Sequence, residues 1–182
     1  AHELEEMQDY IDLDIENVLW IEGNPDVVNK NKYRVEGTPH RLVQGLIYDR
    51  DNIDLEFNIT DNYQSSSILK FGKHKEYHPT VNITQTVVLK STTIQTILKN
   101  NDFTPDMYDF VNLDIQGVEL RALKGFGELL DGIKYIYTEV NSGQVYENND
   151  LITDLDDFLD QKGFIRVETC LLYTSDAADD TP

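Results

Sequence analysis

One stretch of the chain constrains its fold more than any other, because an apolar run leads through a tight turn into a helical pattern. Residues 108–115 read as a buried strand that carries Asp114 near its end, and Gln116-Gly117 reads as the turn. Apolar residues then recur over 118–130 at the spacing of one helix face. A strand that passes directly into a helix is the repeating unit of an α/β domain with a largely parallel sheet.

The same rhythm continues on both sides of this stretch. Residues 18–21 form a β-branched and aromatic run bounded by Gly23-Asn24-Pro25, which predicts a buried strand and then a helix that Asn24 caps. Residues 61–79 are mostly polar and predict a long loop. Ser65-Ser66-Ser67 in this loop could cap a helix or contact substrate, and capping is the expected role. We expect further strands over 41–48, 54–60, 81–90, 133–140 and 164–168, and further helices over 3–11, 92–99 and 151–162.

The charge balance narrows the class of partner. The chain has 34 acidic residues against 15 lysines and arginines, which gives a net charge of −19. A field of this sign repels phosphates, so nucleic acid and anionic membrane surfaces are disfavoured. No apolar run approaches the roughly 20 residues that cross a bilayer, so no membrane span is expected. No signal peptide is visible, and the expected location is cytoplasmic.

The last residues depart from the rest of the sequence. Residues 170–182 begin with CLLYTSDAADD, the string that a common sequencing adapter yields on translation. We therefore expect a domain over 1–169 and a non-native tail over 170–182. The tail holds the only cysteine, Cys170, so disulfide and cysteine–metal chemistry are not expected in the domain.

Carboxylates stand where successive strands are expected to end. Glu22 follows the run 18–21, Asp114 lies near the end of 108–115, and Glu139 lies near the end of 133–140. Ligands of an open parallel sheet bind beyond the carboxyl ends of its strands, so these acids predict a binding site. Glu22 can accept hydrogen bonds from a ribose diol, and an acid before a helix also stabilises the helix dipole; both interpretations stay open.

The side chain of Asp114 is predicted to be buried. A carboxylate at the end of so apolar a strand needs a partner, which can be a ligand cation, a metal, or backbone amides at the start of the next helix. Glu119 lies in the first turn of that helix, where the helix dipole alone explains an acid. Gly117 permits a close approach of the backbone.

Several of these segments together resemble a known family. NLDIQGVELRALKG at 112–125, WIEGNP at 20–25 and YTEVN at 137–141 look like the hallmark segments of the FkbM-type methyltransferases, as do QSSS at 64–67 and GFIRVET at 163–169. The similarity covers essentially residues 1–169. It implies a Rossmann-like class I methyltransferase fold, a mostly parallel twisted sheet flanked by helices. It also implies transfer of a methyl group from S-adenosylmethionine to a hydroxyl of a small molecule or sugar.

The resemblance also implies a role for individual residues. Glu22 would bind the ribose hydroxyls of the cofactor, Gly45 and Leu46 would lie near its adenine, and Asp114, the catalytic candidate, would lie near its amino-acid end or the transferring methyl. The acceptor would meet Glu139 and Asn141, and no resident metal is implied. The complete cofactor-binding set is Ala1, His2, Glu22, Asn24, Gly45, Leu46, Asp114 and Gln116.

The sequence departs from the family pattern at both ends. Ala1-His2-Glu3 look like the last residues of the glycine-bearing loop that follows the first strand, and the glycine and this strand are absent. The last strand would follow Thr169, so we expect a fold truncated at both ends. The first strand would lie between the strands at 18–21 and 110–115. We therefore predict a break between these two strands, in the form of an unfilled groove or of closure of one strand on the other.

Alignment of the acceptor oxygen with the methyl carbon would supply most of the catalysis. His74, His78, Asp114 and Glu139 are the candidates for a base, and the two histidines are expected to be exposed on the polar loop, not to bind a metal. Two other functions stay open. A nicotinamide-dependent oxidoreductase would also hold a ribose through Glu22, and a non-catalytic domain would keep the fold without the cofactor.

Overall fold

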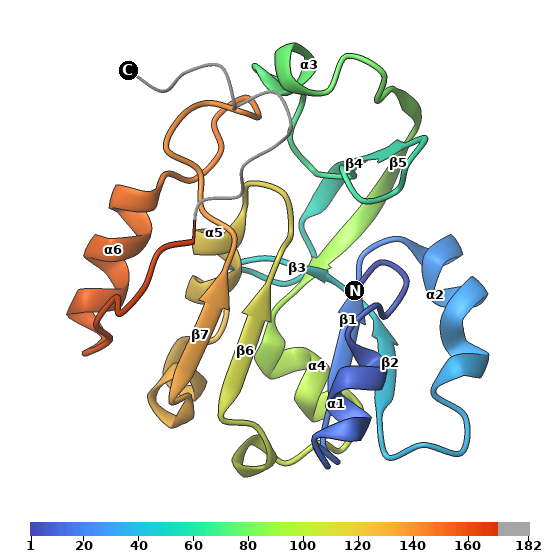
Figure 1. Ribbon diagram of the computed structural model, residues 1–182, viewed down its shortest axis with the longest axis vertical. Coiled ribbons are helices and arrows are strands. Elements are labelled where there is room, and N and C mark those ends of the chain that lie inside the picture. The colour runs from blue at the N-terminus through green and yellow to red at the C-terminus, as the bar shows by residue number, and fades with distance from the viewer. Residues whose placement is uncertain (171–182) are drawn as a thin grey trace.

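The computed structural model describes residues 1–170, and α/β structure runs through most of this range (Figure 1). The predicted tail from 171 onward lies outside the described residues. The chain opens with a short helix, α1 (Met7–Asp12). This helix is shorter than the one predicted over 3–11, because residues 2–6 form turns and Leu4 has a positive φ of 53°.

The first strand–helix–strand unit follows the prediction closely. β1 (Leu19–Glu22) and β2 (Arg41–Gln44) pair in parallel, and α2 (Pro25–Asn31) with a 3₁₀ turn (Lys32–Arg34) connects them. The side chain of Asn24 accepts a hydrogen bond from the backbone N–H of Asp26 at 3.0 Å. The predicted N-cap is therefore confirmed.

Residues 110–138 form a second parallel pair of strands. β6 (Phe110–Leu113) pairs with β7 (Tyr135–Thr138), and α5 (Glu119–Lys124) lies between them in the sequence. The single helix expected over 118–130 is divided into α5 and a 3₁₀ helix (Gly127–Gly132). Gly127 has a φ of +57°, a left-handed conformation that interrupts an α-helix.

The middle of the chain forms a small mixed sheet. β5 (Ile83–Thr92) pairs in parallel with β3 (Leu46–Ile47) and antiparallel with β4 (Asp54–Thr60), and α4 (Ile94–Asn100) follows β5. The strand predicted over 41–48 is split at Gly45, where the chain passes from the β1–β2 pair to this sheet. A Cβ at Gly45 would lie 2.6 Å from Cδ1 of Ile97, so the crossing packs too closely for a side chain.

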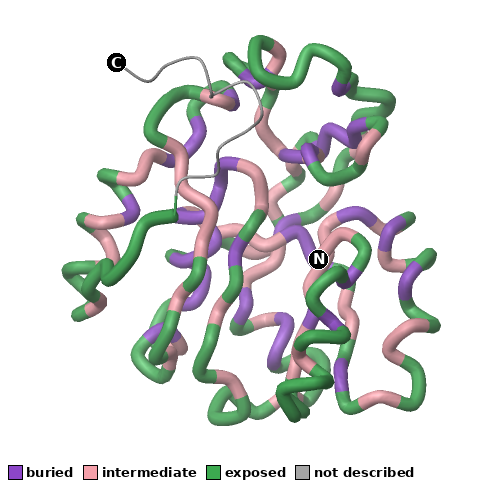
Figure 2. The backbone as a smooth tube through the Cα atoms, viewed as in Figure 1, coloured by how far each residue is buried: buried purple, intermediate pink, exposed green. Residues whose placement is uncertain are grey.

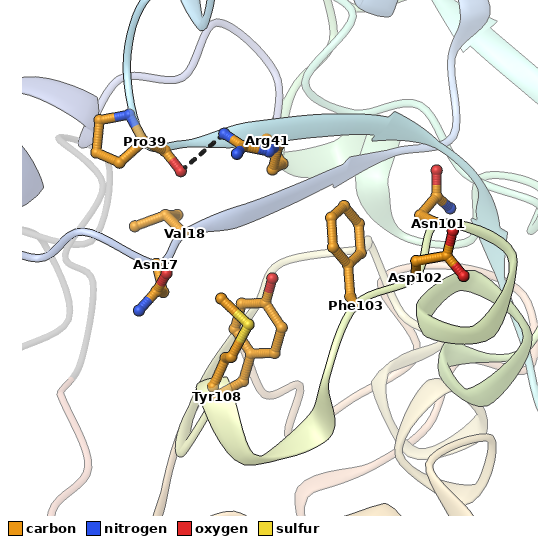
Figure 3. Close-up of a pocket in the computed structure, with 9 residues that line it drawn as sticks. Asn17, Val18, Pro39, Arg41, Asn101, Asp102, Phe103 and Tyr108 are labelled. Carbon is orange, nitrogen blue, oxygen red and sulfur yellow. Dashed lines mark hydrogen bonds between the residues drawn. The ribbon is translucent and has the colours of Figure 1, made fainter.

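The predicted break between the strands at 18–21 and 110–115 is confirmed. Within residues 1–170, β1 and β6 belong to separate sheets, and a cavity of about 260 Å³ lies beside their amino-terminal ends. Figure 3 shows Phe103 and Tyr108, which precede β6, facing Asn17 and Val18, which precede β1. The parallel strands are thus present as two pairs, not as the one continuous sheet that the family resemblance implies.

Both parallel pairs nevertheless share one core. Leu123 and Leu130 are almost fully buried between α4, α5, α6 (Ile152–Gln161) and β6, and Leu19 and Ile21 of β1 pack against the same cluster. A smaller cluster joins Trp20 to Leu4 and Met7. Figure 2 colours the buried residues purple along the backbone. This packing holds β1 and β6 on the same body without hydrogen bonds between them.

One predicted strand is wrong. Residues 164–168 have no strand conformation, and the side chains of Ile165 and Val167 are 83% and 94% exposed. A strand needs a neighbour for its backbone hydrogen bonds, and no strand within residues 1–170 pairs with this segment.

None of the helices in residues 1–170 is long and apolar enough to cross a membrane.

Candidate functional site

Three acidic side chains mark the carboxyl ends of the parallel strands. Glu22 is the last residue of β1, Asp114 directly follows β6, and Glu139 directly follows β7. Both strand pairs run in the same direction in Figure 1, so these acids lie toward the same edge of the domain. This edge is where an open parallel sheet places its ligands.

A glutamine side chain joins the two acids on the β6–β7 pair. Nε2 of Gln116 donates one hydrogen bond to Oδ1 of Asp114 and another, of 3.0 Å, to Oε2 of Glu139. Gln116 has a φ of +58°, a left-handed conformation that L-residues seldom adopt. Such backbone strain is typical of functional loops, and here it directs the amide toward both carboxylates.

The other end of the Gln116 amide meets a tyrosine that the sequence argument missed. The hydroxyl of Tyr146 lies 2.7 Å from Oε1 of Gln116 and 3.2 Å from the carbonyl oxygen of Ser65. Tyr146 is only 2% exposed. Burial and the negative charges of Glu139 and Asp114 raise the pKa of Tyr146, so its hydroxyl stays protonated and able to donate.

The polar loop 61–79 contributes to the same cluster. Oγ of Ser67 donates to the carbonyl oxygen of Gln116 at 2.8 Å and accepts from the backbone N–H of Leu69 at 3.1 Å. The expected helix capping by Ser65-Ser66-Ser67 is therefore wrong. These serines form polar contacts within the loop and with Gln116. Ser67 and Gln116 are 49 residues apart in the sequence.

Burial changes the proton affinity of Glu139. Loss of solvent raises the pKa of Glu139 well above its ordinary value, and the charge of Asp114 beside it raises it further. Two neighbouring carboxylates repel each other, and the repulsion is relieved when one of them keeps its proton. Glu139 therefore keeps its proton near neutral pH.

The buried carboxylate of this loop is Glu119, and the predicted burial of Asp114 is wrong. Asp114 is exposed, because β6 ends at Leu113 and the chain leaves the core there. Glu119 is 1% exposed and its Oε1 accepts from the backbone N–H groups of Ile115 and Gly117, both at 3.1 Å. Burial raises the pKa of Glu119 to about 7. The helix dipole alone does not account for this residue.

Glu22 forms a second cluster with two of the predicted cofactor residues. Its Oε1 accepts from the backbone N–H of Asn24 at 2.7 Å, and its Oε2 lies 3.3 Å from the α-amino group of Ala1. The side chain of Asn24 is buried, and within residues 1–170 its Nδ2 has no hydrogen-bond partner. His2 is directed elsewhere, with Nδ1 at 2.8 Å from Glu5.

The remaining predicted residues are placed near these clusters but differ in exposure. Leu46 is buried against Phe57, and its Cδ1 lies 3.1 Å from where a Cβ on Gly23 would be. Gly45 is packed against Ile97. Asn141 accepts a hydrogen bond from the backbone N–H of Ile152 at 3.0 Å through its carbonyl oxygen, which ties the loop after β7 to α6.

The two histidines of the polar loop have different environments. His78 is exposed as expected, but His74 is buried and stacks on Phe71 with a ring separation of 4.3 Å. Burial lowers the pKa of His74 to about 4, so the ring is neutral at neutral pH. Within residues 1–170 no group of three or more metal-ligating side chains comes together.

Two cavities of about 260 Å³ lie away from the acids. One is the cavity of Figure 3, where Arg41 donates to the carbonyl oxygen of Pro39, and the other lies between β2, β5 and α4. Neither is lined by Glu22 or Asp114. A pocket shared by these two acids stays a prediction.

Comparison with protein families identifies the family of the chain. The family described as Methyltransferase FkbM domain matches residues 8–166. The chain belongs to the FkbM methyltransferase family. The family resemblance of the strand-end segments is thereby confirmed, and methyl transfer is the general activity of this FkbM chain. Comparison with curated proteins and comparison with solved structures each found no match.

Proposed function

We propose that this FkbM chain transfers a methyl group from S-adenosylmethionine to a hydroxyl of a small molecule or sugar. The observation that carries the proposal is the placement of acidic side chains at the carboxyl ends of β1, β6 and β7 in a member of a methyltransferase family. The strongly negative net charge of −19 agrees with a cationic sulfonium as ligand and with an acceptor that is not a polyanion.

The residues around Glu22 fit the sugar of this cofactor. Nδ2 of the buried Asn24 has no partner within residues 1–170, and a buried amide without a partner is costly. A ribose hydroxyl can accept from Asn24 and donate to Glu22, which would satisfy both groups.

The cluster on the β6–β7 pair fits the reacting end. S-adenosylmethionine, when bound, supplies the methyl group on an electrophilic sulfonium. Asp114 is the exposed member of the pair with Glu139, so it is the carboxylate that incoming groups can reach, and we assign it to positioning them. Glu139 and Asn141, on the loop after β7, are assigned to the acceptor. Alignment of the two reactants then supplies most of the rate.

Calorimetric titration tests the cofactor assignment. S-adenosylhomocysteine should bind the chain, and Glu22→Gln should weaken binding on the order of tenfold or more, because hydrogen bonds to a charged group are lost. Glu36→Gln, an exposed change in the same part of the chain, should leave the affinity unchanged. Binding of NADH without S-adenosylhomocysteine would instead identify an oxidoreductase. A folded chain that binds neither would be a non-catalytic domain.

A further inference from the structure

We propose that Tyr146 is a positioning residue that fixes the orientation of the Gln116 amide and thereby holds Asp114 and Glu139 together. Tyr146 carries no role in the proposed function, whereas Glu139 and Asn141 of the same loop are assigned to the acceptor. The inference rests on that function only for its activity measurement, since the positioning itself can be observed without cofactor or acceptor.

The hydrogen-bond capacity of the amide gives the first step. Gln116 has two N–H donors on Nε2, and both are used, one toward Asp114 and one toward Glu139 at 3.0 Å. Oδ1 of Asp114 is an acceptor, so the opposite orientation of the amide would place Oε1 of Gln116 against it, and a protonated Glu139 would be the one acid able to donate to that oxygen. The orientation with Nε2 toward the acids is therefore the one that brings them together.

Tyr146 supplies the donor that this orientation requires. The hydroxyl has a single proton, and both groups near it, Oε1 of Gln116 at 2.7 Å and the carbonyl oxygen of Ser65 at 3.2 Å, are acceptors. The shorter contact is the one to Gln116. Donation to Gln116 requires that the amide present Oε1. In the opposite orientation the hydroxyl would keep only the longer contact to Ser65, so Tyr146 favours the orientation that turns Nε2 toward the acids.

The tyrosine ring is itself held by two segments that are tied together. The backbone N–H groups of Gly72 and His74 both donate to the carbonyl oxygen of Val145, at 3.0 and 2.8 Å. The ring of Tyr146 packs at 6.0 Å from Phe71 and at 5.1 Å from His74. A ring fixed on this many sides keeps its hydroxyl at one point, which is what a positioning role needs.

The charges near the cluster are consistent with this role. Glu139, Asp114 and Glu119 are the acids that act on Tyr146, and they raise its pKa, as burial does. His74, the basic group whose ring packs against it, has a pKa of about 4 and adds no positive charge at neutral pH. The hydroxyl of Tyr146 therefore stays a neutral donor beside Asp114 and Glu139.

Side-chain NMR tests the positioning directly. The Gln116 amide protons should exchange slowly in the native chain, and Tyr146→Phe, which removes only the hydroxyl, should speed their exchange at least tenfold. Backbone amides of β6 should keep their protection. Tyr137→Phe is the matched control, because Tyr137 is 61% exposed on β7, and it should change neither. Equal exchange of the Gln116 amide in the native and Tyr146→Phe chains would overturn the proposal.

A double-mutant cycle supplies the second measurement. Tyr146→Phe and Gln116→Ala should each lower kcat for methyl transfer by at least tenfold, and the double variant should be no slower than Gln116→Ala alone. Additive losses would show that Tyr146 acts independently of Gln116 and would overturn the proposal. If the native chain transfers no methyl group, the proposed function fails, and the NMR result still decides the positioning.

A further variant covers the case in which Tyr146→Phe does not fold. Gln116 is partly exposed, so Gln116→Ala removes the bridge with little loss of packing. The pH at which Glu139 takes up its proton, followed by carboxyl NMR, should then move. An unchanged titration in Gln116→Ala would show that the amide does not hold the pair, and the proposal would fall.

Discussion

The carboxylate of Glu119 accepts a hydrogen bond of 3.1 Å from the backbone N–H of Gly117, two residues before it in the chain. The same oxygen accepts from Ile115, so the first residue of α5 closes the loop that carries Asp114 and Gln116. The two hydrogen bonds from Ile115 and Gly117 to Glu119 hold the backbone of this loop on its buried side, and Asp114 lies on the exposed side. Stability and site geometry depend on the same buried acid.

This arrangement predicts a pH dependence. The folded-state pKa of Glu119 is about 7, above its ordinary value of 4.5, so the folded chain binds the proton more tightly than the unfolded chain. The contribution is fully present below pH 4.5 and is lost as the pH rises through 7. In urea unfolding, the contribution of Glu119 to the free energy of unfolding should fall by about 3 kcal/mol as the pH rises from 4.5 through 7.

Glu119→Gln provides the comparison for that measurement. Glutamine keeps an acceptor oxygen for the two amides but has no proton to lose, so this part of the pH slope should disappear. Glu128→Gln replaces an exposed acid of the following 3₁₀ helix and should keep the native slope. An unchanged slope in Glu119→Gln would assign the pH dependence to another group.

His74 predicts a slope of the opposite sign. Its pKa is lowered from 6.5 to about 4 by burial, so the unfolded chain binds the proton more tightly. Stability is then present above pH 6.5 and falls as the pH drops toward 4. His74→Phe keeps the stack on Phe71 and should remove this loss in acid unfolding experiments. His78→Gln, four residues along and exposed, should leave it in place.

A steric prediction follows from the end of α5. A Cβ on Gly125 would lie 2.1 Å from the backbone carbonyl oxygen of Tyr48, which cannot move as a side chain can. Gly125→Ala should destabilise the chain by about 3 kcal/mol or more, as overpacked sites do. Gly132→Ala meets nothing within 4 Å and should be neutral or slightly stabilising. Thermal or urea unfolding distinguishes the two, and equal stability would contradict the packing described.

The sequence predicted those features that depend on neighbours along the chain. The β1, β6 and β7 strands and the Asn24 cap follow from apolar runs and turn residues within a few positions. The strand at 164–168 has the same local pattern, but a strand also needs a pairing partner. Local pattern cannot supply that partner, so this prediction was wrong.

The site was predictable only in part for the same reason. Glu22, Asp114 and Glu139 were found because strand ends can be read from the sequence. Tyr146 lies in an irregular loop, 30 residues from Gln116, and no periodicity connects them. Burial of Glu119 in place of Asp114 depends on where β6 leaves the core. Tertiary contacts determine both the Tyr146–Gln116 hydrogen bond and the burial of Glu119.

Asn24 allows helix capping to be separated from cofactor binding. Asn24→Ser keeps an oxygen that can accept from Asp26 and removes the buried Nδ2. The variant should therefore match the native chain in unfolding free energy, whereas Asn24→Ala should lose about 1 kcal/mol. If Nδ2 binds the ribose as proposed, Asn24→Ser should also weaken S-adenosylhomocysteine several-fold in calorimetry. Native affinity in Asn24→Ser would restrict Asn24 to the cap and leave Glu22 alone to hold the sugar.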